Sequence, residues 1–260
     1  MENRTEFVPM GLGELLDRSL ELFKNNFVKF YIITLLGYLP ILLMIIIAII
    51  SGLLSGSSSD AFPAILGITT VVLFIPMILG IVISKGGLIK AASDGFLGRE
   101  IIPGDCLRLG LKKSFAYMVA GFLAGLAATF GYLFFLIPGI IFTAWFLLIG
   151  PVTILEDSGY ASALGRSRQL VKGKFWRTWG FIIVIGFLGY ALIGAISQVL
   201  SFIPVVGQLA GFFVQIAIVP FQTIAATLYY YNQRSIMEGY DLDLRAGQIY
   251  APSEGDVPIG

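Results

Sequence analysis

Few residues in this chain have the types and spacing that chemistry needs. Glu156 and Asp157 form one tight acidic pair beside an apolar stretch. Paired carboxylates can act as general acid and base where their surroundings push their pKa values apart. No neighbouring residue supplies such an influence, so we expect a structural pair. It precedes a predicted helix capped by Ser158, where negative charge suits the positive end of the helix dipole.

A second candidate is a basic segment, "RSRQLVKGKFWR", at residues 166–177. Trp176 lies within it and Trp179 follows it. Cations beside an aromatic anchor attract anionic lipid headgroups, and cations at such a position also fix membrane orientation. Both explanations stay open. The candidate headgroup ligands are Arg166, Arg168, Lys172, Lys174 and Arg177.

A third candidate is a stripe of amides, Gln208, Gln215 and Gln222, spaced seven residues apart in a long apolar stretch. The spacing places them on one helical face. Such amides commonly hydrogen-bond between membrane helices, and they could alternatively line a substrate route.

Several kinds of site are excluded by residues that the sequence lacks. It has no histidine and one cysteine, Cys106, which excludes Ser-His catalysis, His-ligated metals and an internal disulfide. No phosphate-binding glycine motif occurs, and a net charge of +1 without lysine-rich tracts argues against nucleic acid. We therefore expect no catalytic residues, no metal and no cofactor. The small-xxx-small pairs Gly121/Gly125 and Gly207/Gly211 are expected to be helix-packing sites.

The composition is that of a membrane protein, because 57% of the residues are hydrophobic and only 13% are charged. Uncharged intervals lie between Lys29 and Asp60 and between Asp60 and Lys85, each long enough for one span. Two longer intervals are interrupted by "LIPGI" (136–140) and "SFIPVVG" (201–207), so each is split into two spans. The predicted spans are 28–54, 64–85, 114–136, 138–155, 176–199 and 208–231.

The cations predict the orientation of these spans. None of the 17 Lys and Arg residues lies in the predicted loops 55–63, 137–140 and 200–207. The positive-inside rule then places both termini in the cytoplasm. Strands are rejected because the apolar runs are too long and do not alternate as membrane-barrel strands do.

One charged segment occurs twice: "LDRSLELFKNNF" (16–27) returns as "LGRSRQLVKGKF" (164–175), sharing L-x-R-S-x-x-L-x-K-x-x-F. Each copy has an apolar and a charged helical face, so both are predicted to be amphipathic helices at the membrane interface, each leading into a hairpin of spans. A degenerate third copy is "LRLGLKKSF" (107–115). Together with Pro76, Pro151 and Pro220, one in each even-numbered span, this predicts three tandem units. The prolines should face protein.

Three stretches together resemble a known family: "LGELLDRSLELFKNNF" (12–27), "PVTILEDSGYASALGRSRQLVKGKFWR" (151–177) and "TLYYYNQRSIMEGYDLDL" (227–244). They are similar to the membrane domain of some bacterial glycerophosphodiester phosphodiesterases and to related stand-alone polytopic proteins of unknown function. The catalytic barrel of those enzymes, with its histidine and metal-binding carboxylates, has no counterpart among these residues. Phosphodiesterase activity is therefore not expected.

The sequence thus predicts an all-α, multi-pass bundle of six transmembrane helices in the cytoplasmic (inner) cell membrane. Its predicted parts are a cytoplasmic tail with an amphipathic helix (1–27), a six-span domain (28–237) and a cytoplasmic tail (238–260). We expect a non-enzymatic scaffold or accessory component that engages membrane lipids, anionic ones included, with a membrane protein as a second candidate partner. The alternatives are a transporter or channel subunit for a neutral or lipid-like substrate and, third, an intramembrane enzyme.

Overall fold

The regular structure of the protein is entirely helical in the residues that the computed structural model describes, which are 10–55, 61–156, 159–200 and 204–238. This confirms the all-α prediction. The predicted cytoplasmic tail at 238–260 lies almost wholly outside these residues. In chain order the helices are α1 (Leu12–Asn25), α2 (Phe27–Ser55), α3 (Ala61–Phe96), α4 (Pro103–Phe134), α5 (Leu136–Trp145), α6 (Ile149–Leu155), α7 (Tyr160–Val171), α8 (Phe175–Leu200) and α9 (Pro204–Glu238).

Six segments of the described chain are long and apolar enough to cross a membrane, which agrees with the predicted number. They are Phe27–Gly52, Pro63–Phe96, Pro103–Phe134, Leu136–Leu155, Phe175–Ile196 and Leu209–Glu238. The chain is therefore a multi-pass membrane protein.

Several helices continue well beyond the predicted spans. The span expected to end at residue 85 belongs to α3, which continues to Phe96, and α9 continues to Glu238. The prediction used charge to mark the ends, but charged residues are good helix formers when opposite charges lie four residues apart. Lys90 and Asp94 form such a pair at 2.5 Å in α3, as do Arg234 and Glu238 at 3.1 Å in α9.

The fourth span is divided, which was not predicted. Helix α5 ends at Trp145 and α6 begins at Ile149, with Phe146–Leu148 between them. The preceding turn is also shorter than expected. Phe135 alone, in an extended conformation, separates α4 from α5, and Pro138 lies in the first turn of α5, where its missing N–H costs nothing.

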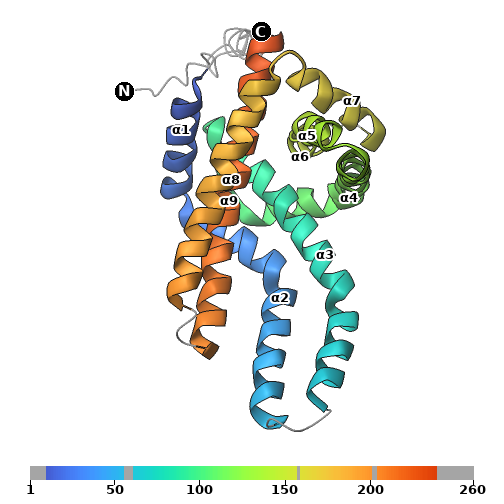
Figure 1. Ribbon diagram of the computed structural model, residues 1–260. Coiled ribbons are helices and arrows are strands. Elements are labelled where there is room, and N and C mark those ends of the chain that lie inside the picture. Colours follow the sequence, from blue (N-terminus) through green and yellow to red (C-terminus); the bar gives the residue numbers. More distant parts are fainter. Residues whose placement is uncertain (1–9, 56–60, 157–158, 201–203, 239–260) are drawn as a thin grey trace, which may run out of the picture.

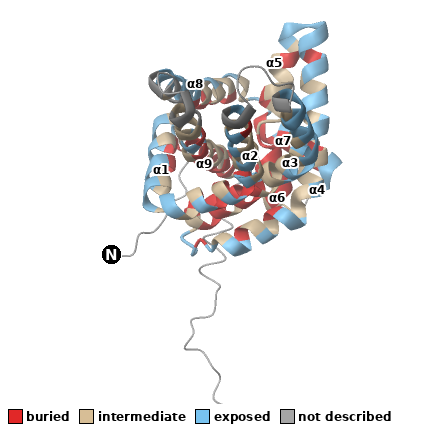
Figure 2. Ribbon diagram, turned by 90° about the horizontal axis from the view of Figure 1, so that it is seen from below, coloured by how far each residue is buried: buried red, intermediate tan, exposed pale blue. Residues whose placement is uncertain are grey.

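Most of the buried apolar residues gather at one end of the molecule, which we call the core end. It contains α1, α7, and the C-terminal ends of α3, α6 and α9, with Leu88, Leu148, Leu170 and Tyr229 among its fully buried residues. Figure 1 shows the hairpins α2–α3 and α8–α9 extending away from it in the same direction, whereas α5 and the later part of α4 are seen almost along their axes. Figure 2 shows buried residues where the helices meet and exposed ones along the projecting helices. Exposed apolar side chains there suit a lipid environment.

The helices pack as three units in a closed ring. The last segments of the three hairpins, α3, α6 and α9, contact one another pairwise. The helix that begins each unit packs on the last segment of the unit before it: α4 on α3, α7 on α6, and α1 on α9. The first span α2 follows the same rule by packing on α9, whereas α8 contacts α5 of the preceding unit. This arrangement agrees with the three predicted tandem units.

The two copies of the charged segment are structurally equivalent. Helices α1 and α7 begin 148 residues apart, after Gly11 and Gly159, and α2 and α8 begin at Phe27 and Phe175, again 148 residues apart. The equivalent serines, Ser19 and Ser167, are both fully buried. The third copy differs, because 107–115 is not a separate helix but the continuous start of α4.

The prolines and glycines only partly follow the predictions. Pro151 and Pro220 are buried as expected, but Pro76 is exposed, because its part of α3 lies beyond the core end. The prediction of close helix packing was wrong for Gly121, Gly125 and Gly211, because no atom lies within 4 Å of the position that a Cβ would take. The close approaches are elsewhere. The backbones of Gly37 and Gly80 contact each other between α2 and α3, and Gly110 lies against the carbonyl of Ile83.

Candidate functional site

The basic segment lies at the core end, where α7 contacts α6 and α9. Arg166, at the centre of α7, donates a 2.8 Å hydrogen bond from Nε to Glu156 and forms an ion pair with Glu238. The Tyr230 hydroxyl donates to Glu156 at 2.8 Å. Arg234 completes the group by pairing with Glu238 and donating to the Tyr230 hydroxyl at 3.2 Å. We call these five residues the ionic clasp.

The clasp is partly shielded from water. The side chain of Glu156 is 15% exposed and that of Arg166 is 26% exposed. Hydrogen bonds to Glu238 and Glu156 raise the pKa of Arg166 above its ordinary value, although burial acts in the opposite direction. Arg166 therefore stays charged and holds the ends of α6 and α9 together. The acidic residue that the sequence placed at a helix dipole is instead an ion-pair partner, and the residue that caps α7 is Gly159 rather than Ser158. Asp157 and Ser158 lie outside the described residues.

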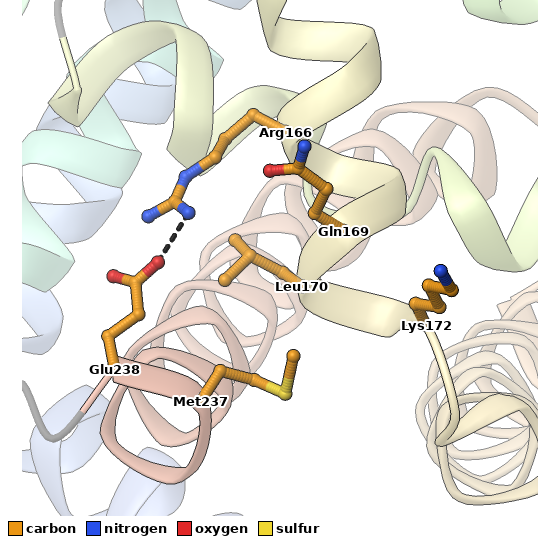
Figure 3. Close-up of a pocket in the computed structure, with 6 residues that line it drawn as sticks. All are labelled: Arg166, Gln169, Leu170, Lys172, Met237 and Glu238. Carbon is orange, nitrogen blue, oxygen red and sulfur yellow. Dashed lines mark ion pairs between the residues drawn. The ribbon is translucent and has the colours of Figure 1, made fainter.

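A pocket of about 310 Å³ opens beside the clasp (Figure 3). Its lining consists of Arg166, Gln169, Leu170, Lys172, Met237 and Glu238. In Figure 3 Arg166 and Glu238 point toward each other across the gap between α7 and α9, while Lys172 lies apart from that pair, beyond Leu170. The pocket thus combines one neutralised ion pair, one separate cation and apolar side chains.

The five predicted headgroup ligands do not form one cluster. Arg166 belongs to the clasp, and Arg168 lies over the Trp145 ring with its guanidinium carbon 4.2 Å from the ring centroid. Arg177 donates a hydrogen bond to the backbone carbonyl of Met10. Burial, and then the charge of Arg177, lower the pKa of Lys174. Lys172 is exposed and directly follows α7.

The serine that the two charged segments share has a structural role in each of them. Ser167 Oγ donates to the Trp145 carbonyl at 2.6 Å and accepts a hydrogen bond from the Leu148 amide at 3.2 Å. It thereby satisfies backbone groups at the break between α5 and α6. Ser19 Oγ donates to the Leu15 carbonyl within α1 at 2.6 Å. A small buried hydroxyl at this position lets α1 and α7 pack closely on their neighbours.

The predicted glutamine stripe does not converge on one described cavity. Gln215 is exposed, and Gln222 is partly buried with its amide against Gly189 of α8. The side chain of Gln208 lies outside the described residues. These amides do not line the pocket beside the clasp, nor two further surface pockets of the described residues, one between α2, α3 and α4 and one between α1, α8 and α9.

Sequence reasoning missed the partners that α9 supplies, Tyr230, Arg234 and Glu238. The available signal was the Arg234–Glu238 spacing of four residues at the end of an apolar stretch. Their pairing with α7 depends on how the units close, which no local pattern encodes. Comparison with protein-family models, curated proteins and solved structures finds no match to this chain.

Proposed function

We propose that this chain is a non-enzymatic scaffold or accessory protein of the cytoplasmic membrane that engages anionic lipid through α7. In this proposal the core end faces the cytoplasm, because the cations of the chain flank the segments that meet there and cytoplasmic loops are enriched in Lys and Arg. The sequence resemblance to membrane domains that accompany phosphodiesterases supports an accessory role.

One observation carries the proposal. Three exposed residues lie close together in the sequence where α8 follows α7: Arg168 in the last turn of α7, Lys172 just after it and Trp176 at the start of α8. Trp176 is 83% exposed, more than any other large apolar side chain among the described residues. Exposed cations followed closely in the sequence by an exposed indole ring match the boundary between headgroups and acyl chains. Each cation near an anionic membrane surface contributes about 1 kcal/mol of attraction.

The first repeat provides a contrast within the same molecule. The residues equivalent to Arg168, Lys172 and Trp176 are Leu20, Lys24 and Val28, with one cation in place of two. Glu14, Asp17 and Glu21 also make α1 acidic. The same framework is therefore basic in one unit and acidic in another, which favours lipid binding at α7 over α1.

The test compares Lys172→Gln with Lys24→Gln in the full chain, reconstituted in nanodiscs of phosphatidylcholine and phosphatidylglycerol. Both lysines are exposed and stand at the same repeat position. We expect Lys172→Gln to lower the enrichment of phosphatidylglycerol around the protein about fivefold, the equivalent of one surface cation, and Lys24→Gln to leave it unchanged. Native mass spectrometry of the retained lipids measures both.

Added salt should reduce the enrichment in the wild type, because exposed charges are screened. Equal effects of the two substitutions would contradict the proposal, as would an enrichment that salt does not alter. Either result would leave membrane orientation as the reason for the cations.

A further inference from the structure

The ring of three units creates three equivalent junctions, each between a hairpin and the helix that begins the next unit. Among the described residues, a surface groove lies at the first of these junctions and another at the last. One groove, of about 390 Å³, lies between α2, α3 and the start of α4, and we call it the α4 groove. The other, of about 540 Å³, lies between α8, α9 and α1, and we call it the α1 groove. Both volumes fall in the range of about 300–1,000 Å³ that is typical of ligand pockets.

The same register positions line both grooves. Aligning the Lys and Phe shared by the repeats pairs Lys112 and Phe115 with Lys24 and Phe27. In this alignment Arg108 and Leu111 of the α4 groove correspond to Leu20 and Phe23 of the α1 groove, and all four residues line their grooves. The two grooves are therefore versions of one site, one with a cation and one without.

At the third junction, the residue at this repeat position contacts another side chain of the protein. The residue equivalent to Leu20 and Arg108 is Arg168 of α7. Helix α7 packs against α4 and α5. Arg168 lies over the Trp145 ring of α5. There, an apolar group with an electron-rich face lies beneath the cation.

The α4 groove also places a cation beside apolar side chains, but no group of the described residues pairs with this cation. Arg108 is exposed, and among the described residues it has no hydrogen bond or ion pair. The remaining lining residues are uncharged: Leu36, Gly37, Gly80, Ile83, Gly104, Leu107 and Leu111. Unlike the pocket beside the clasp, this groove has no acidic lining residue that would neutralise the cation.

We infer that the α4 groove binds one anionic phospholipid, with part of an acyl chain between α2, α3 and α4 and its phosphate on Arg108. The apolar lining suits the chain, and the unpaired guanidinium suits the phosphate, to which it can donate two hydrogen bonds. The groove exists because Gly37 and Gly80 place no side chains in it while their backbones touch. This site is separate from α7 and does not depend on the proposal made for it.

The test is photolabelling of the full chain in phosphatidylcholine nanodiscs. The probes are trace phosphatidylglycerol or phosphatidylcholine, each with a diazirine on one acyl chain, and labelled peptides are mapped by mass spectrometry. We expect phosphatidylglycerol to label the groove residues of α2, α3 and α4 about fivefold more than phosphatidylcholine does. Arg108→Gln should remove this preference. Lys112→Gln, an exposed cation of the same helix outside the groove lining, should keep it.

A gain-of-function variant tests the equivalence of the grooves. Leu20 is exposed, so Leu20→Arg leaves the core unchanged and should create a preference for phosphatidylglycerol at the α8 and α9 residues of the α1 groove. Equal labelling by the two lipids in the wild type would mean bulk lipid contact only and would overturn the inference. So would a preference that survives Arg108→Gln or one that Leu20→Arg does not create.

Discussion

Gly80→Ala should destabilise the protein by about 3 kcal/mol or more, because a Cβ at residue 80 would overlap the carbonyl oxygen of Gly37. The obstructing atom belongs to the backbone of α2, so no change of rotamer can relieve the overlap. The two helices would have to separate. Their separation would also strain the hydrogen bond of 3.1 Å from Ser84 Oγ to the Ile33 carbonyl, which joins α3 to α2.

The matched control is Gly125→Ala in α4. Gly125 is also inside a long helix, but nothing lies within 4 Å of its Cβ position. This substitution should stabilise the protein by up to about 1 kcal/mol, since alanine is the better helix former. Thermal unfolding of the full chain in detergent measures both variants. A Gly80→Ala protein as stable as the wild type would show that α2 and α3 do not approach closely at this point.

Arg166→Met should lower the unfolding free energy by about 2–4 kcal/mol, because it removes the cation that joins Glu156 and Glu238 to α7 and leaves both carboxylates to Arg234 in a partly buried site. Methionine retains most of the apolar stem, so the loss reports the charge rather than the volume. The melting temperature of the full chain in detergent should fall by roughly 5–10 °C.

The first repeat again supplies the control. Arg18 stands at the equivalent position and pairs only with Glu14, on the same helix, at 3.2 Å. Both side chains are more than 30% exposed, so Arg18→Met should cost no more than about 0.5 kcal/mol. If the two substitutions destabilise the protein equally, the ionic clasp does not join α6, α7 and α9.

The sequence alone predicted those parts of the fold that depend on local patterns. The uncharged apolar intervals identified six spans, and the repeat of 148 residues predicted α1 and α7 as separate helices. The helix ends were less predictable. Lys85 marked an end by charge, yet α3 continues past it to Phe96, and in this continuation Lys90 and Asp94 pair across one helical turn.

The candidate site could be predicted only in part, because its contacts join distant segments. The sequence identified the cations of residues 166–177 but not that they contact different partners. Arg166 finds its partners in α6 and α9, and Arg168 finds Trp145 in α5. Arg108 was overlooked as a candidate for the same reason. Its significance comes from the groove between three helices and from its equivalence to Arg168.

In the proposed topology the core end of this multi-pass protein faces the cytoplasm, and cysteine accessibility in intact cells tests this orientation. Ser58 and Ser201 lie in the predicted cation-free loops, outside the described residues, and Glu100 is exposed between α3 and α4. Cys106 is 1% exposed, so it should give little background labelling. With an impermeant maleimide, Ser58→Cys and Ser201→Cys should react in intact cells, and Glu100→Cys only after permeabilisation. Labelling of Glu100→Cys in intact cells would contradict this orientation.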